Sequence, residues 1–203
     1  MSKLSYKILL YQELIANYVY ILPEYDNMKS MGRGSTGAKA GAVAGIIYGI
    51  ILSVLTEAIL FVEKSTVMAT LAIYAKEFSS SIITLTASDL YNSEVMIEPV
   101  ALIIEGIIGG LILGAIFGMA VHKLPGRNDK IKGIGFGIIL WVLFDVLLGL
   151  GNRAEFGNTY FLLTVVAGLV AVIIYGYLLG LLFGKWWVDP SKVQQNESFM
   201  YNN

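Results

Sequence analysis

One apolar sequence occurs twice in this chain, as G-I-I-Y-G-I-I-L-S-V-L-T-E-A-I-L at residues 45–60 and as G-I-G-F-G-I-I-L-W-V-L-F-D-V-L-L at residues 133–148. Nine of the 16 aligned positions are identical, and Glu57 aligns with Asp145. Each copy lies within an apolar run of about 20 residues, the length that a helix needs to cross a bilayer. Apolar helices resemble one another by composition, but aligned glycines and an aligned acid are harder to obtain by chance. The chain is therefore predicted to be a membrane protein with an internal repeat.

The composition supports this class. The 203 residues are 56% hydrophobic and 14% charged, whereas a soluble domain typically carries about 25% charged residues. The net charge of −1 provides no basic surface to attract nucleic acid. The chain has no cysteine and one histidine, His122, which excludes thiolate metal sites and a haem held by two histidines of one chain. We expect no metal and no cofactor.

The predicted fold is an all-α membrane protein with four transmembrane helices in a domain at residues 40–183. The spans are placed at Ala40–Val62, Pro99–Val121, Ile131–Leu150 and Tyr160–Phe183. The external loop at residues 63–98 is expected to be helical, because apolar residues keep helical spacing there, at Val67, Leu71, Tyr74, Phe78, Ile82 and Leu85. A run of serines at residues 79–81 is expected to interrupt that helix. Residues 184–203 form a tail.

The loop charges predict the orientation of the spans. Eleven of the 14 Lys and Arg residues lie in residues 1–39, in residues 122–132 or in the tail. The opposite side has only Lys64, Lys76 and Arg153. Basic residues accumulate on the cytoplasmic side of membrane proteins. We therefore expect a multi-pass protein of the cell membrane with both termini in the cytoplasm.

Residues 1–39 are predicted to form an amphipathic helix followed by a flexible, Gly-rich lead-in to the first span. The apolar residues recur at spacings of four and three, at Leu4, Ile8, Tyr11, Ile15, Tyr18 and Leu22, which places them on one face of a helix. Pro23 is expected to end this helix. Two interpretations are open: the helix lies on the cytoplasmic leaflet as an interfacial amphipathic helix, or it packs on a partner protein.

The lead-in contains Gly32-x-Gly34-x-x-Gly37, the spacing of a dinucleotide-binding loop. A dinucleotide site needs a strand before the glycines and an acidic residue about 20 residues after the motif's strand–helix turn. The preceding residues 23–30 are polar and turn-like instead, and no Lys-Ser or Lys-Thr pair follows Gly37 as in a phosphate loop. We therefore expect no nucleotide site.

Small residues repeat at intervals of four in all four spans. This packing stripe consists of Gly41, Gly45, Gly49, Gly106, Gly110, Gly114, Gly118, Gly133, Gly137, Gly176 and Gly180. In lipid there is little hydrophobic drive between helices, so small residues that allow close backbone approach favour their association. The stripe predicts tight helix packing and needs no further function to explain it.

The second and fourth spans also match, more weakly, at an offset of 62 residues, where Gly106 aligns with Gly168 and Gly114 with Gly176. Each half of the repeat then holds two spans, so both halves have the same orientation in the membrane. This is a parallel repeat, related by an axis along the membrane normal. Transporters and non-transporting bundles share this design.

Three spans contain a single acid, Glu57, Glu105 or Asp145, and all three acids are predicted at similar depth in the outer half of the bilayer. Ionisable groups inside a membrane are costly and suggest a functional site. The three carboxylates could share protons or hold a cation. The alternative is structural: each acid reaches water or pairs with Lys64 or Arg153.

We expect a non-enzymatic integral membrane protein that acts as a subunit or assembly component of a membrane complex. Its partners would be lipids and either copies of itself or other membrane subunits, with no nucleic acid and no nucleotide. The alternative is a small proton- or cation-coupled transporter or channel that uses the three carboxylates. No nucleophile or set of metal ligands indicates a catalytic site.

Overall fold

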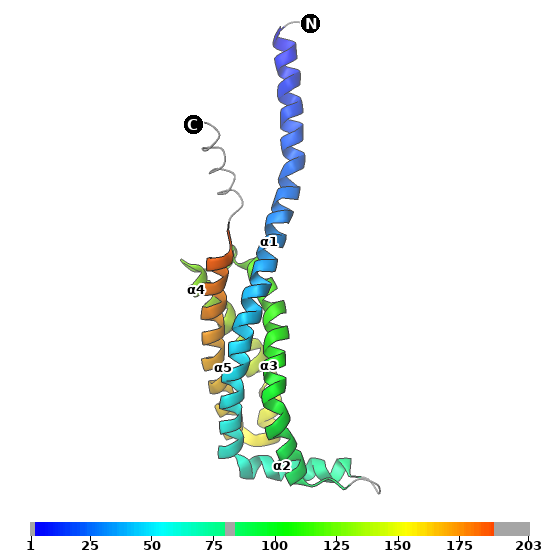
Figure 1. Cartoon of the computed structure of the whole chain (residues 1–203), viewed down its shortest axis with the longest axis vertical. Coiled ribbons are helices and arrows are strands. Elements are labelled where there is room, and N and C mark those ends of the chain that lie inside the picture. Colours follow the sequence, from blue (N-terminus) through cyan, green and yellow to red (C-terminus); the bar gives the residue numbers. More distant parts are fainter. Residues whose placement is uncertain (1–2, 80–83, 189–203) are drawn as a thin grey trace.

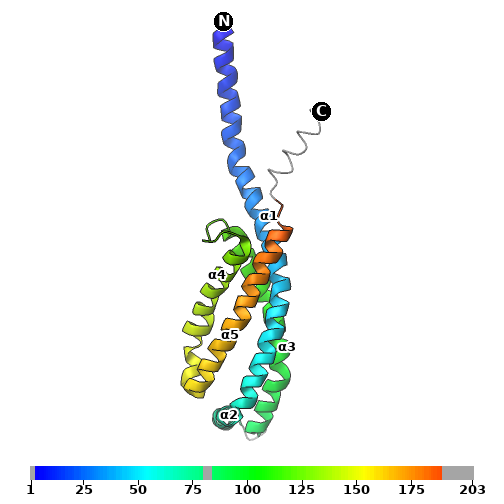
Figure 2. The ribbon, with the colours of Figure 1, turned by 90° about the vertical axis from the view of Figure 1, so that its left-hand side faces the viewer.

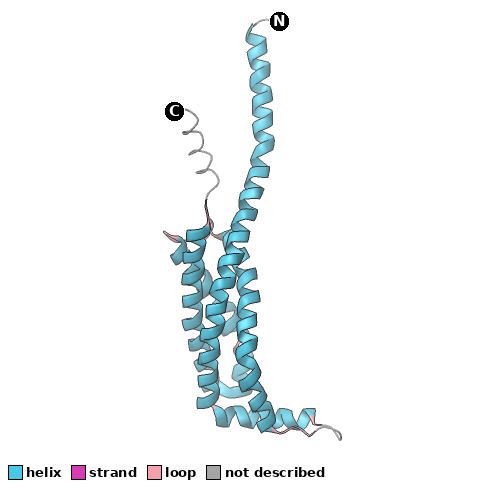
Figure 3. Ribbon diagram, in the orientation of Figure 1, coloured by secondary structure: helices cyan, strands magenta, loops and turns pink. Residues whose placement is uncertain are grey.

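The structure is a computed structural model that describes residues 3–79 and 84–188, and this part of the chain contains helices and no strand (Figure 1, Figure 3). The elements are α1 (Lys3–Val62), α2 (Lys64–Phe78), α3 (Ala87–Ala120), α4 (Asp129–Trp141), the π-helix η1 (Val142–Leu148) and α5 (Leu150–Trp186). The all-α class predicted from the sequence is confirmed.

Two antiparallel hairpins make up the bundle. α1 packs along α3, α4 packs along α5, and the two hairpins meet mainly where α1 contacts α5. The contacts give the spatial order α3, α1, α5, α4. The helices at its two ends, α3 and α4, are not a closely packed pair. Figure 2 shows the two hairpins diverging towards the end of the bundle that carries α2.

Four helices are long and apolar enough to cross a membrane, namely Gly32–Val62 of α1, Ala87–Ala120, Asp129–Leu148 and Leu150–Trp186. By length and composition the chain is a multi-pass membrane protein, as the sequence predicted. The start of the first span, the turn between α3 and α4, and the end of α5 all lie at one end of the bundle, opposite α2 (Figure 1).

The N-terminal segment differs from the prediction. α1 is one helix of 60 residues, so Pro23 does not end it and the Gly-rich stretch before Ala40 is helical. A proline removes one backbone hydrogen bond and can bend a helix without terminating it. Figures 1 and 2 show this part of α1 continuing along the long axis beyond the other helices, not lying across the end of the bundle as an interfacial helix would.

α3 begins 12 residues before the predicted start of the second span. Thr86 and Asp89 form a capping box: the Thr86 hydroxyl accepts from the Asp89 amide at 3.2 Å, and the Asp89 carboxylate accepts from the Thr86 amide at 3.0 Å. This exchange satisfies two backbone donors and fixes the helix start. Pro99, which we expected at the first turn of the span, lies inside the helix.

α2 lies across the end of the bundle (Figure 1) and confirms the predicted helix after the first span. It ends at Phe78, and Ser79 adopts an extended conformation, which agrees with the expected break. Ser80, Ser81 and Ile82 lie outside the described residues, and Leu85 is not helical. The buried Tyr91 hydroxyl donates to the Leu60 carbonyl at 3.3 Å and connects α3 to the end of α1 beside α2.

The third and fourth spans are joined by helix and not by a loop. α5 begins at Leu150, directly after η1, and contains one non-helical residue, Gly157, with φ +85° and ψ 176°. Glycine adopts a positive φ without steric cost. The predicted fourth span, which begins at Tyr160, corresponds to the part of α5 after this kink.

The closest contacts within each hairpin are between glycines. A Cβ atom at Gly41 would overlap the Gly110 carbonyl oxygen, and one at Gly45 would overlap that of Gly106. Gly37 of the nucleotide-like motif meets Gly114 and Gly118 in the same way, so the motif lies in the packed part of α1. The stripe glycines of α1 and α3 therefore face each other along their length.

The second hairpin repeats these contacts in a different register from the one predicted. Gly133 meets Gly176, as the equivalent Gly45 meets Gly106, and Gly137 meets Val172, as Gly49 meets Leu102. The first and third spans are thus equivalent at an offset of 88 residues. In these contacts the second and fourth spans are equivalent at an offset of 70 residues, and not at the offset of 62 given by the alignment of their glycines. The two offsets differ by about two helical turns.

Glycines that lie near one another in the sequence, but inside or outside the contact, give a direct test of this packing. Gly110→Ala and Gly133→Ala should each lower the free energy of unfolding in detergent by about 1–3 kcal/mol, because the added methyl overlaps the facing backbone. Gly109→Ala and Gly135→Ala place the methyl in open space and should leave stability unchanged or raise it by up to about 1 kcal/mol. Thermal denaturation of the four variants measures this. Equal effects at all four positions would contradict the packing.

Candidate functional site

A cavity of about 350 Å³ lies between the two hairpins. We call it the cleft. Its walls come from α1, α3, α4, η1 and α5, and most of its lining is apolar. The side chains with polar atoms that line it are Tyr48, Glu105, Trp141, Asp145 and Tyr175. α3 and α4, which both line the cleft, are not among the closely packed pairs of helices.

Two of the three predicted acids, Glu105 and Asp145, line the cleft. Both lie close enough to Tyr48 for their charges to act on its hydroxyl. Glu105 extends from an exposed position on α3, next to the glycine contact at Gly106. The close contact of α1 with α3 therefore fixes the backbone on which Glu105 sits.

Asp145 lies at the centre of the π-helix η1 and is half-buried. Its carboxylate rests directly against the backbone of Gly168 on α5, where any larger residue would displace it. A π-helix is rare and occurs frequently at functional sites. The combination of a π-helix with a facing glycine places this acid at the wall of the cleft.

Glu57, the third predicted acid, does not line the cleft although it aligns with Asp145. Glu57 lies in regular α-helix and is exposed. The wider turn of the π-helix, about one residue more per turn, changes the direction in which its residues point relative to an α-helix. The two aligned acids therefore occupy different surfaces, and the structure does not bring the three acids together.

The two copies make similar, though not equivalent, hydrogen bonds just before this point. Ser53 and Trp141, aligned in the repeat, each donate a hydrogen bond to a backbone carbonyl of the partner helix in their hairpin. The Ser53 hydroxyl reaches Pro99 at 3.1 Å and the Trp141 indole reaches Val165 at 2.8 Å. These bonds fix the helix pairs beside the cleft.

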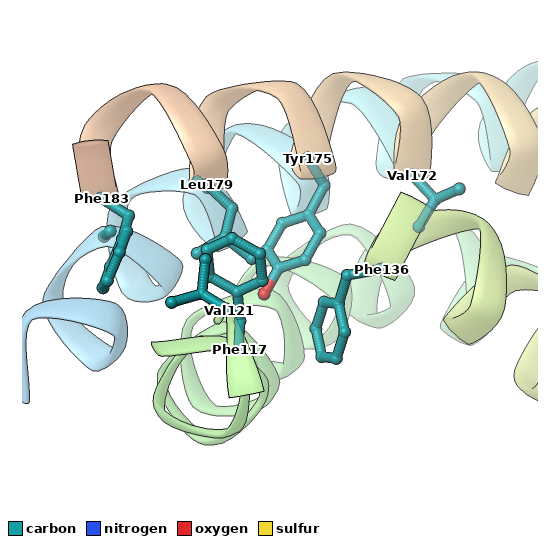
Figure 4. Packing of buried hydrophobic residues seen from close by; sticks show 9 residues of the cluster. Phe117, Val121, Phe136, Val172, Tyr175, Leu179 and Phe183 are labelled. Carbon is teal, nitrogen blue, oxygen red and sulfur yellow. The ribbon is translucent and has the colours of Figure 1, made fainter. Parts of the chain in front are cut away.

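The Tyr175 hydroxyl is buried and has no hydrogen-bond partner among the described residues. Its ring contacts the Tyr48 ring edge-on, with 5.8 Å between centroids, and the residue lines the cleft. A buried hydroxyl without a partner costs about 1–3 kcal/mol. Figure 4 shows it pointing away from α5, on the side of Phe117 and Phe136.

Aromatic side chains close the end of the bundle opposite α2. The Phe117 ring contacts Phe136 at 5.6 Å and Phe183 at 5.5 Å between centroids, and Phe183 stacks on Trp187. Phe117 is completely buried. These contacts bring α3 and α4 together at this end (Figure 4).

The remaining acids do not build a metal site. Glu98 lies within electrostatic reach of Glu94, Glu105 and Glu57, yet the described residues contain no group of three Asp, Glu, His or Cys side chains placed to hold a metal ion. The basic residues predicted as partners are engaged elsewhere: the Lys64 ammonium lies over the Tyr91 ring, and Arg153 donates to Asn158 at 2.6 Å.

A second cavity, of about 290 Å³, lies between α1 and α5 near α2 and is lined only by apolar side chains. It has no group that could orient a polar ligand. The cleft differs because it combines an apolar lining with two carboxylates, an indole and two phenols. Such a site can bind an amphipathic molecule and orient its charged end.

Two buried tyrosines test the environment of the cleft. Tyr175→Phe should raise the free energy of unfolding by about 1–3 kcal/mol, because it removes a buried hydroxyl without a partner. Tyr91→Phe should lower it by about 1 kcal/mol, because it removes the bond to Leu60. Both variants are compared with the parent by denaturation in the same detergent. A loss of stability in Tyr175→Phe would show that its hydroxyl is hydrogen-bonded in the purified protein.

No curated protein and no solved structure matches this chain. One family does match, over residues 31–193. The matched region contains all four candidate spans and the cleft, whereas residues 1–30 of the chain, with most of the projecting part of α1, precede it. The chain belongs to this family, which is described as a family of unknown function (DUF6789).

Proposed function

We propose that the protein is a non-enzymatic component of a membrane complex, in which the bundle is the anchor and the projecting part of α1 binds a partner. The observation that carries this proposal is the continuation of α1 beyond the other helices (Figures 1 and 2). An isolated helix is only marginally stable in water, and most helices in proteins are stabilised by packing of an apolar face. A projecting helix with an apolar stripe needs another surface.

The sequence supplies that stripe, from Leu4 to Leu22, on the part of α1 that precedes the family match. The segment therefore lies outside the region that assigns the chain to the family. The partner is a second copy of this chain or another subunit of the complex.

We propose the same orientation for both hairpins and a cytoplasmic location for both termini. Support comes from the end of the bundle opposite α2, where α1 enters the bundle, α5 ends and the turn with Lys123 and Arg127 lies (Figure 1). Basic residues favour the cytoplasmic side. In this orientation α2 lies across the external end and the projecting helix extends into the cytoplasm.

Cysteine labelling tests the topology, because the native chain has no cysteine. Arg127→Cys should be protected from an impermeant thiol reagent in intact cells and react after the membrane is permeabilised. Asn92→Cys and Ala154→Cys, both exposed near the α2 end, should react in intact cells. Labelling of Arg127→Cys from outside would reverse the orientation.

Charges placed on the stripe test the interaction. The double variant Ile8→Glu with Ile15→Glu should lose most of the partner that copurifies in mild detergent, because a charge is costly at a buried contact. The control double variant, Asn17→Glu with Asn27→Glu, adds the same charge on the other side of the helix and should retain the partner. The native mass of the purified particles is the measurement. An identical mass for both double variants and the parent would refute this role of the stripe.

A second candidate function is cation-coupled transport, favoured by the position of Glu105 and Asp145 in one cleft. The aromatic contacts at one end and the divergence of the hairpins at the other are the geometry expected of a bundle open to one side of the membrane. Transport would require the hairpins to move about α1 and α5. Cation-dependent flux in proteoliposomes that is lost in Asp145→Asn would support this function over a purely structural one.

A further inference from the structure

We propose that the cleft is a binding site for an organic cation with an apolar body, such as an ammonium group that carries aryl or alkyl substituents. The site consists of the carboxylates of Glu105 and Asp145, the rings of Tyr48, Trp141 and Tyr175, and an otherwise apolar lining. This inference does not depend on the proposed role in a complex, because it concerns the bundle and not the projecting part of α1.

The charge of the cleft is unbalanced. Among the described residues that line it, two are acidic and none is Lys, Arg or His. Carboxylates in apolar surroundings are costly when they lack a partner of opposite charge. A bound cation would supply that partner, so its binding energy would include relief of this cost.

The lining distinguishes an organic cation from a metal ion. A small metal ion needs about six oxygen ligands to replace its water shell, and two carboxylates among apolar side chains cannot supply them. The described residues provide no third metal-ligating side chain at this place. A substituted ammonium is weakly hydrated by comparison and is attracted to the faces of Tyr and Trp rings. The chemistry of the cleft therefore fits a bulky organic cation.

The Tyr175 ring supplies an aromatic face of the cleft, while its hydroxyl is buried on the side of Phe117 and Phe136 (Figure 4). The residue is 4% exposed, its hydroxyl is without a hydrogen-bond partner in the described structure, and its ring forms part of the wall. The hydroxyl has no surface open to the cleft, so the ring of Tyr175 and not its hydroxyl would contact the ligand.

Size and access agree with a small ligand. A volume of about 350 Å³ is at the lower end of the range for small-molecule sites, roughly 300–1,000 Å³. The cleft is lined by candidate membrane spans, two of which, α3 and α4, are not closely packed on each other, so a ligand could enter it from the bilayer. The cationic group could come from a free molecule or from the amine of a lipid headgroup, which share the same chemistry.

The test uses the full-length protein in nanodiscs of phosphatidylglycerol, whose headgroup carries no cation. Radiolabelled benzyltriethylammonium is the ligand, because its charge is permanent. Saturable binding is expected for the parent. The double variant Glu105→Gln with Asp145→Asn should bind about tenfold more weakly or not at all, because it removes both charges that face the ligand. Each single variant should show part of this loss.

The matched control is Glu57→Gln with Glu94→Gln, which removes two carboxylates of α1 and α3 that do not line the cleft. It should bind as the parent does. Equal weakening in both double variants would reduce the effect to overall charge and overturn the site. Equal competition by the neutral analogue, with carbon in place of nitrogen, would also overturn it, since the cleft would then be a groove for apolar chains.

Replacement of a neutral diacylglycerol by phosphatidylcholine, at a constant phosphatidylglycerol content and therefore a constant surface charge, identifies the source of the cation. If the headgroup is the natural ligand, the affinity for benzyltriethylammonium should fall as the choline content rises. If the natural ligand is a free cation, the affinity should stay constant. Both results support the site, provided that binding still depends on Glu105 and Asp145.

Discussion

Backbone contact between glycines is the constraint on which the rest of this structure depends. Water does not drive apolar helices together within a bilayer, so their association relies on close van der Waals contact. Gly41 and Gly45 provide it against Gly110 and Gly106, and Gly133 provides it against Gly176. Two stiff hairpins result. Neither hairpin needs the other to hold its own two helices together. Side chains therefore need not fill the space between the hairpins completely.

The parts of the fold that the sequence predicted are those set by composition and regular spacing: four spans, the helix after the first span, and the glycine faces. The errors lie where a single local feature was decisive. The sequence predicts a helix end at Pro23 and the start of the second span at Pro99, but both prolines lie within helices, because a long helix tolerates one missing hydrogen bond. Thr86 and Asp89, a capping box that sequence inspection could have found, mark the true start of α3.

The site was predicted in part. Glu105 and Asp145 share a cleft, but Glu57 does not. The alignment implies equivalent positions for Glu57 and Asp145. No residue type in the sequence predicts the π-helix that contains Asp145. Tyr48 aligns with Phe136 in the repeat, and Tyr175 has no distinctive motif, so neither suggested a role beforehand. Gly168 aligns with Gly106 in the sequence, yet its neighbour is the Asp145 carboxylate and not a helix backbone.

The π-helix breaks the symmetry of the duplicated chain. Residues 45–60 align with residues 133–148 without a gap, but only the second copy changes its helical geometry, between Val142 and Leu148. A symmetric homodimer of two identical hairpins could not build the same cleft. The two equivalent acids would then both line the cleft or both lie outside it. Fusion of the two hairpins in one chain allows each to specialise. The different winding of one helix therefore accompanies different surroundings for the aligned acids Glu57 and Asp145.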